Sequence, residues 1–190
     1  MIIHAVLLKS ICVYCGSASG TNPAYAVAAR EMGRLLATSD RVVVYGGGGI
    51  GLMGEVARSA MDAGGKVIGV IPTHLNTRER AYDAVDLRVV SSMHERKQTM
   101  ADLADAFVAL PGGLGTFDEL FEILTWAQIG LHGKPVGVLN VAGYFDALLS
   151  MIDLAVREGF APAATRARIV AANTPAALID ALEHAARSSA

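Results

Sequence analysis

The segment PGGLGTFDEL, residues 111–120, combines two features that oppose each other in charge. Its glycines and threonine precede an expected helix, and the free amide N–H groups at a helix start attract anions such as phosphate. The same helix start carries carboxylates at Asp118, Glu119 and, one turn further on, Glu122. Either these acids only cap the helix, or the backbone holds a phosphate while the acids face a sugar.

Both alternatives can be written in terms of individual residues. Thr116 and Glu119 have the spacing of a capping box, in which the carboxylate merely closes the helix start. In the catalytic alternative, Glu119 and Glu122 point at a sugar and Arg96 offsets their negative charge. The phosphate is then bound by the amides of Gly112, Gly113, Gly115 and Thr116.

A second helix start, in SSMHERKQTM, supplies the cations. Ser92 and Glu95 fit a capping box, which places the start of this helix near Met93. Arg96 and Lys97 then fall near the positive end of the helix dipole, which disfavours each cation by ~0.3–1 kcal/mol. Two adjacent cations in this position indicate a nearby anion, whereas a solvated pair on an exposed face is the alternative.

Two more glycine-rich loops follow expected strands: CGSASG at 15–20 and GGGGIGLMG at 46–54. Glycine lets backbone N–H groups approach phosphate oxygens, so three such loops favour a nucleotide or sugar-phosphate ligand. No acidic residue ends the strand after the second loop, which argues against NAD, and neither loop supplies the residues of an ATP-hydrolysing P-loop. Expected ligand contacts in the two loops are Ser17, Gly47, Gly48, Gly51 and Met53.

The elements that must position these loops alternate along the chain. Apolar strands that are each followed by a helix predict a parallel sheet covered on both faces, a doubly wound Rossmann-like α/β fold with three layers, α/β/α. We expect strands at 10–16, 41–47, 66–72, 86–92, 106–112 and 135–141. We expect helices at 24–39, 51–64, 93–104, 116–130, 144–159 and 174–189. The connection 73–86 is either a binding loop or a solvated surface segment.

Length and composition fit one nucleotide-binding domain over residues 1–190, with 1–8 as a flexible or strand-extending segment. A net charge of −2 argues against a general nucleic-acid coat, and no apolar stretch approaches the ~20 residues of a membrane helix. Cys12 and Cys15 form a C-x-x-C pair within and just after a strand, which favours packing over redox chemistry. His94 and His132 lack metal-ligand spacing. In the absence of a secretory or membrane signal, we expect a cytoplasmic location by default.

Taken together, these motifs resemble the Lonely-guy family, the cytokinin-activating phosphoribohydrolases of plants and microbes. The similarity covers nearly the whole chain, and it is most specific in the pairing of MHERK with PGGLGTFDE. The resemblance implies that Arg96 and Glu119 are the catalytic pair. It also implies substrate contacts at Glu79, Lys97, Thr125 and the stretch 113–119. Although this family has carried the label lysine decarboxylase, we find no constellation for a pyridoxal cofactor.

The resemblance implies hydrolysis of N6-modified AMP, and of AMP itself, to free base and ribose 5-phosphate, with no cofactor and no metal. The sugar becomes cationic as the base departs, so a carboxylate at Glu119 would stabilise it. The alternatives are a non-catalytic nucleotide-binding module and a general AMP-hydrolysing salvage enzyme. The resemblance also implies a homodimer with helices at the interface, although core packing alone explains many of the apolar residues in helices 116–130 and 144–159.

Overall fold

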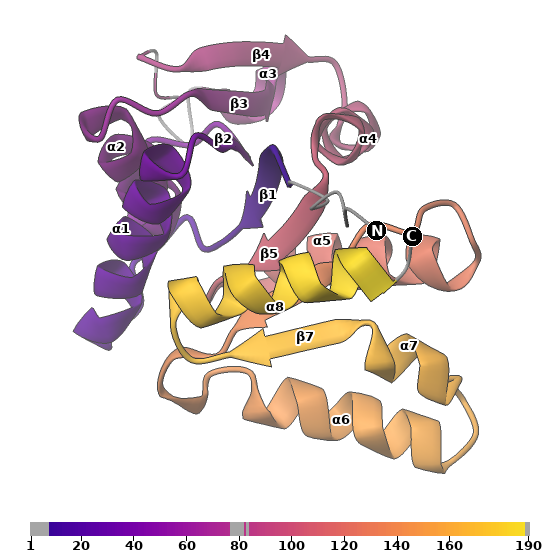
Figure 1. The fold of residues 1–190 in the computed structure, drawn as a ribbon. Helices are drawn as coiled ribbons and strands as arrows, with labels where there is room; N and C mark the ends of the chain where they lie inside the picture. Colours follow the sequence, from indigo (N-terminus) through magenta and orange to yellow (C-terminus); the bar gives the residue numbers. More distant parts are fainter. Residues whose placement is uncertain (1–7, 77–81, 83, 189–190) are drawn as a thin grey trace, which may run out of the picture.

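The computed structural model describes residues 8–76, 82 and 84–188, which contain a seven-stranded parallel sheet flanked by helices (Figure 1). The strand order is β4-β3-β2-β1-β5-β6-β7. The doubly wound α/β prediction is therefore confirmed. The strands are β1 Ser10–Tyr14, β2 Val42–Tyr45, β3 Val67–Pro72, β4 Asp86–Val90, β5 Ala106–Ala109, β6 Val136–Leu139 and β7 Ile169–Ala172.

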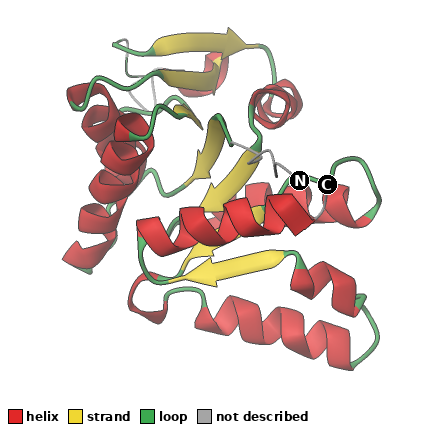
Figure 2. Cartoon of the chain, viewed as in Figure 1, coloured by secondary structure: helices red, strands yellow, loops and turns green. Residues whose placement is uncertain are grey.

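Helices cover both faces of this sheet (Figure 2). Side chains of α1, α2 and α8 share one buried apolar cluster with one face of the strands. Side chains of α4, α5 and α6 share a second cluster with the opposite face. The helices are α1 Pro23–Thr38, α2 Gly51–Asp62, α3 Thr73–Asn76, α4 Met93–Leu103, α5 Leu114–Gln128, α6 Asp146–Arg157, α7 Ala163–Ala167 and α8 Pro175–Ser188, with a short 3₁₀ turn, η1, at Val141–Gly143.

The register of the central strands brings the glycine-rich loops together. Val13 of β1 pairs with Tyr45 of β2 on one side and with Val108 of β5 on the other. The chain moves outward from β1 in one direction through β4 and then returns to add β5 on the other side. The carboxyl end of β1 is therefore the switch point of the sheet, where ligands bind in folds of this type.

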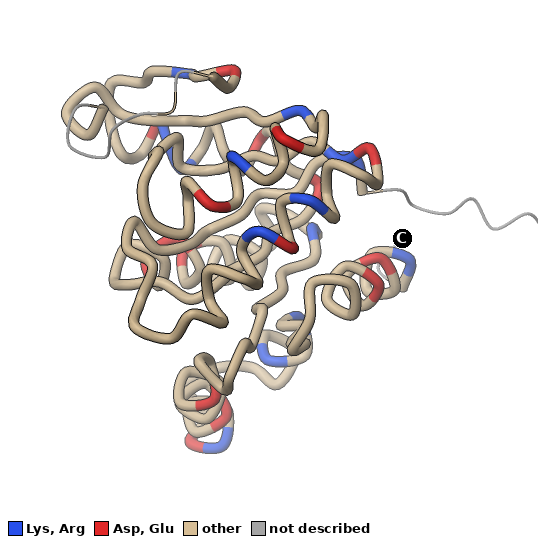
Figure 3. The backbone as a smooth tube through the Cα atoms, turned by 90° about the vertical axis from the view of Figure 1, so that its left-hand side faces the viewer, with Lys and Arg blue, Asp and Glu red and all other residues tan. Residues whose placement is uncertain are grey.

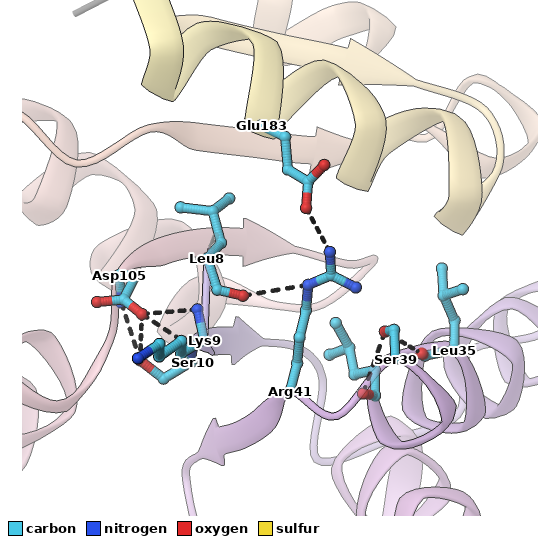
Figure 4. A network of polar contacts seen from close by, with 9 residues as sticks. Leu8, Lys9, Ser10, Leu35, Ser39, Arg41, Asp105 and Glu183 are labelled. Atoms are coloured by element: carbon cyan, nitrogen blue, oxygen red, sulfur yellow. Dashed lines mark hydrogen bonds and ion pairs between the residues drawn. The ribbon is translucent and has the colours of Figure 1, made fainter. Parts of the chain in front are cut away.

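Polar contacts fix the opposite, amino-terminal end of β1 (Figure 4). The Asp105 carboxylate accepts hydrogen bonds from the backbone N–H of Lys9 at 2.8 Å and of Ser10 at 3.0 Å. Arg41 donates from Nε to the Leu8 carbonyl at 3.1 Å and pairs with Glu183 of α8. These contacts join α8 to the amino-terminal ends of the central strands, opposite the ends that carry the glycine-rich loops.

Three parts of the chain differ from the sequence prediction. β7 and α7 were not predicted, because a four-residue strand at the sheet edge and a five-residue helix are too short to show a period. The connection 73–86 begins with the short helix α3. α5 starts at Leu114, two residues before the expected start. Residues 1–7 of the predicted flexible segment lie outside the described residues, whereas Leu8 is buried.

Candidate active site

Arg96 is held in place by main-chain carbonyls of strand β3 and of the residue that follows the neighbouring strand β2. It lies in the second turn of α4, whose N-cap is Ser92 as predicted, although the Glu95 carboxylate bonds Ser91 instead of closing the box on Ser92. The Arg96 Nε donates to the Val70 carbonyl and Nη2 to the Gly46 carbonyl, both at 3.1 Å. The guanidinium is buried, so its position is fixed before any ligand arrives.

Glu119 is the ion-pair partner of this arginine. Its Oε1 lies 3.1 Å from Arg96 Nη1, and both side chains are more than nine-tenths buried. The N-cap of α5 is Gly113, so Thr116 lies inside the helix and does not cap it. The capping-box interpretation of Thr116 and Glu119 is therefore wrong. The structure therefore joins the two residues that were expected to be the catalytic pair in a buried ion pair.

Lys97 balances the remaining acids of the α5 helix start. Its ammonium lies 3.1 Å from the Asp118 carboxylate and 3.0 Å from that of Glu122. Partial burial lowers the pKa of Lys97, but its hydrogen bonds to Glu122 and Asp118 outweigh this effect and raise the pKa overall. Arg96 and Lys97 of α4 thus face three acids of α5, and these carboxylates offset the unfavourable position of the two cations near the start of α4.

The PGGLGT loop presents an open backbone beside this pair. A Cβ added at Gly113 or Gly115 would have no atom within 4 Å. Gly112 is different, because a Cβ there would lie 2.1 Å from the Thr116 hydroxyl. The loop borders a cavity of about 240 Å³ lined by Gly16, Ser17, Ala18, Ser19, Gly20, Tyr25, Leu52, Pro111, Gly112, Gly113 and Tyr144.

The loop after β2 is closed by packing. A Cβ on Gly46 would lie 2.0 Å from Arg96 Nη2, and one on Gly51 would lie 2.3 Å from the Ser17 backbone. Gly51 also has a φ of +59°, a conformation that favours glycine. The predicted contacts Gly47, Gly48 and Met53 are buried here. This loop therefore packs against Arg96 and accepts one of its hydrogen bonds.

The remaining predicted contacts are more scattered. Ser17 is exposed and lines the cavity. Thr125 is exposed on α5, and its hydroxyl donates to the Phe121 carbonyl of the same helix at 2.7 Å. Glu79 lies outside the described residues. Within the described residues, no group of three or more His, Cys, Asp or Glu side chains is arranged to hold a metal ion.

The two cysteines lie beneath the site and are both buried and free. Burial raises the pKa of Cys12 and of Cys15, and the nearby Glu119 carboxylate raises both further. A thiol with a raised pKa provides little of the thiolate that redox chemistry needs. The structure therefore agrees with a packing role for this pair.

Two aromatic residues at the cavity were not identified from the sequence. Tyr25 of α1 and Tyr144 between β6 and α6 line it, and their rings meet edge to face with centroids 5.5 Å apart. The Tyr144 hydroxyl donates to the Gly112 carbonyl, 32 residues earlier in the chain. Only the fold brings these segments together, although the position of Tyr144 just beyond an expected strand end was a usable signal.

The fold places a glycine-rich loop at the carboxyl end of β5 near a buried Arg–Glu pair, and comparison with known proteins assigns the family. Residues 53–182 match the family described as "Possible lysine decarboxylase". The chain is 53% identical over 176 residues to the cytokinin riboside 5′-monophosphate phosphoribohydrolase LOG of Oryza sativa subsp. japonica, covering 92% of this chain and 73% of that protein. The chain belongs to this family, as its resemblance to the Lonely-guy proteins predicted.

Another relative and a solved structure extend the comparison. A cytokinin riboside 5′-monophosphate phosphoribohydrolase of Arabidopsis thaliana is 50% identical, with 92% of this chain and 82% of that protein covered. The Moco carrier protein of Chlamydomonas reinhardtii matches with a TM-score of 0.70 and 25% identity, covering 96% of this chain and 99% of that chain. The same architecture thus occurs in proteins named as enzymes and in proteins named as carriers.

Proposed function

We propose that this protein hydrolyses the N-glycosidic bond of cytokinin riboside 5′-monophosphates, releasing the free base and ribose 5-phosphate. The observation that carries the proposal is the buried Arg96–Glu119 pair, 3.1 Å apart, next to an open amide loop at a helix start. The relatives named as phosphoribohydrolases at about 50% identity support the same reaction.

The 5′-phosphate binds at the start of α5 in this proposal. The amides of Gly113, Gly115 and Thr116 lie at the positive end of the helix dipole, which favours an anion. Glu119 follows Gly115 by four residues, or roughly 6 Å along the helix axis. A phosphate at the helix start therefore leaves the sugar of the same nucleotide within reach of the Glu119 carboxylate.

Glu119 acts on the sugar as the bond to the base breaks. Positive charge develops on the ribose, and a carboxylate beside C1′ stabilises that charge and orients or deprotonates the attacking water. Arg96 stays protonated and holds the carboxylate in position. In this proposal the phosphate lies where the loop borders the cavity of about 240 Å³, which Arg96 and Glu119 do not line. Lys97, Glu122, Thr125, Ser17 and Glu79 are the further substrate contacts that we propose.

The family description as a decarboxylase receives no support from this site. A pyridoxal Schiff base forms on a lysine that can lose its proton. Lys97, the lysine next to the site, is held by two carboxylates and has a raised pKa, so it is kept charged.

The experiment is product analysis with isopentenyladenosine monophosphate, AMP and the corresponding nucleosides. The wild type should release free base from the nucleotides only. Glu119→Gln should lower kcat by roughly 10²–10⁴-fold while nucleotide binding persists. Asp86→Asn is the control, because it removes a carboxylate that is 63% exposed on the edge strand β4 and belongs to no part of the site. Release by Glu119→Gln at the wild-type rate would reject the proposed role of Glu119.

A nucleotide-binding module is the second candidate, and the likeness to a Moco carrier protein favours it. Binding without release of base by the wild type would establish this candidate over the enzyme. A general salvage enzyme differs in specificity instead. A higher kcat/KM for AMP than for the isopentenyl nucleotide would identify it.

We further propose a homodimer built on α5, α6 and the segments that follow them. Large apolar side chains are exposed there, notably Ile129, Leu131, Met151 and Phe160. Light scattering should give twice the chain mass for the wild type and a monomer for Phe160→Glu. Val27→Glu, at an exposed apolar position on α1, is the control. A wild-type monomer at micromolar concentration would contradict this assembly.

We propose neither a nucleic-acid nor a membrane partner for this protein. Basic and acidic positions are interspersed on the α1 and α2 side of the molecule (Figure 3), which does not favour a nucleic-acid surface. None of the helices in the described residues is both long and apolar enough to cross a membrane. We propose a cytoplasmic location, where free thiols such as Cys12 and Cys15 stay reduced.

A further inference from the structure

Three successive carbonyl groups of the PGGLGT loop are tied back to the protein. The Pro111 carbonyl accepts from the Gly16 N–H at 3.1 Å, and the Gly113 carbonyl accepts from the Phe117 N–H at 3.1 Å. The Gly112 carbonyl between them accepts from the Tyr144 hydroxyl. Two of these donors are main-chain groups that any sequence provides. The third depends on the side chain of one residue.

The Gly112 carbonyl lies in the most freely rotating part of the loop. Gly112 and Gly113 are adjacent glycines, whose backbone rotates more freely than that of other residues. The Gly112 carbonyl and the Gly113 N–H belong to one planar peptide unit and rotate together. If this unit turned over, a carbonyl oxygen would replace an amide N–H at the mouth of an anion-binding loop. The hydrogen bond from Tyr144 holds the unit in one orientation.

Tyr144 is itself firmly positioned by other aromatic rings. It stacks on Phe117 of α5 with a centroid distance of 6.5 Å and meets Tyr25 and Phe145 edge to face at 5.5 and 5.1 Å. The Phe145 N–H in turn donates to the Asn140 side chain at 2.7 Å. The ring has packed neighbours on several sides, so the hydroxyl reaches Gly112 from a fixed direction.

We propose that Tyr144 is a positioning residue for phosphate recognition, acting through the Gly112–Gly113 peptide and not on the reacting sugar. This inference rests on the proposed binding of the 5′-phosphate to the PGGLGT loop. It assigns a role to the connection between β6 and α6, which contributes none of the residues expected from the sequence to contact substrate. The hydroxyl sets the affinity for the phosphate group, and Glu119 sets the rate of bond cleavage.

The test is Tyr144→Phe, which removes the hydroxyl and keeps the ring. The KM for AMP and the dissociation constant of ribose 5-phosphate, measured by calorimetry, should each rise about tenfold, as expected for one lost hydrogen bond. The kcat should stay within about twofold of the wild type, because Glu119 is untouched. Adenosine, which lacks the phosphate, should compete with AMP for both proteins with the same inhibition constant.

Tyr45→Phe is the matched control, because it deletes a tyrosine hydroxyl that has no hydrogen-bond partner among the described residues. Since KM does not depend on the folded fraction of the enzyme, partial unfolding of a variant cannot mimic the expected result. Unchanged affinity for ribose 5-phosphate in Tyr144→Phe, or an equal loss of affinity for adenosine, overturns the inference. If the wild type hydrolyses no nucleotide, the proposed function fails while the ribose 5-phosphate measurement still decides the role of Tyr144.

Discussion

The two glycine-rich loops at residues 46–51 and 111–116 look alike in sequence but use glycine for different reasons. In the first loop an added Cβ would collide with the guanidinium of Arg96 or with the Ser17 backbone. In the second loop Gly113 and Gly115 face open space. Glycine is required for packing at Gly46 and Gly51, and also at Gly112, whereas Gly113 and Gly115 leave open space.

On the proposed function, the first loop is scaffold and the second is the binding surface. The first loop lies under Arg96 and accepts its hydrogen bond through the Gly46 carbonyl. The second loop begins α5, which carries Glu119. Glycine content alone therefore does not identify a phosphate site, because the space around each Cα decides the role. Substitutions to alanine separate the two roles experimentally.

Gly46→Ala should produce the largest effect. The new methyl group would lie 2.0 Å from Arg96 Nη2 and 3.1 Å from the Met53 sulfur, so the guanidinium must move. Displacing one partner of a buried ion pair costs about 3–5 kcal/mol, and kcat should fall by roughly 100-fold or more. Denaturant unfolding and steady-state kinetics measure both losses. Gly133→Ala is the control, since a Cβ there meets nothing within 4 Å. Wild-type stability of Gly46→Ala would contradict the packing role.

Gly115→Ala should affect binding and leave the fold intact. Gly115 lies in the first turn of α5 without a positive φ, so alanine is compatible with the helix and adds up to about 1 kcal/mol of stability. The methyl group would crowd the phosphate, and the KM for AMP should rise about tenfold, as when one ligand hydrogen bond is lost. Thermal unfolding and KM are the measurements. A destabilised variant with normal KM would show that the two loops do not differ as described.

Tyr45→Phe tests the support beneath the first loop. Tyr45 is fully buried just before Gly46, and its hydroxyl has no hydrogen-bond partner among the described residues. Removing a buried unsatisfied hydroxyl should leave stability unchanged or increase it by up to about 1 kcal/mol. Urea unfolding provides the measurement. A loss of stability larger than the error would mean that the hydroxyl is hydrogen-bonded in solution.

His132 provides the smallest expected effect, at the end of α5 remote from the second loop. Its Nε2 lies 2.9 Å from the Ile123 carbonyl, and its Nδ1 accepts from the Lys134 N–H at 3.1 Å. Burial lowers its pKa, aided by the charges of Lys134 and Arg168 and despite the bond to Ile123.

The unfolded chain therefore binds the proton more tightly than the folded one, and stability should decrease as pH falls below about 6.5. Urea unfolding between pH 7.5 and 5.5 would measure this slope, which should be weaker in His132→Gln. Equal slopes in the two proteins would exclude a contribution from His132.

The sequence predicted the fold well where its signals were local and strong. Ser92 was correctly placed as the cap of α4, because a capping serine and an acid three residues on are a short-range pattern. β7 was missed because its four residues show neither alternation nor a long apolar run. The start of α5 was misplaced because Thr116 mimics a cap inside the helix.

The site was predictable only in part for a similar reason. The charge misfit at Arg96 and Lys97 indicated a nearby anion without identifying it, and the structure shows the carboxylates of Glu119, Asp118 and Glu122 there. The hydrogen bond from Tyr144 to Gly112 joins segments 32 residues apart, and no local pattern reports such a contact. Gly51 was predicted as a ligand contact, yet a Cβ there would collide with the Ser17 backbone, because sequence does not reveal which atoms surround a Cα.

The anchoring of Arg96 has a consequence for changing the substrate range of this scaffold. Its guanidinium donates hydrogen bonds to the carbonyl oxygens of Val70 and Gly46, which are main-chain atoms present in every amino acid. Library mutagenesis of side chains around the cavity therefore leaves these two anchors in place. If Arg96 and Glu119 act as proposed, variants with new base preferences can be selected without moving Arg96 from its place on the sheet.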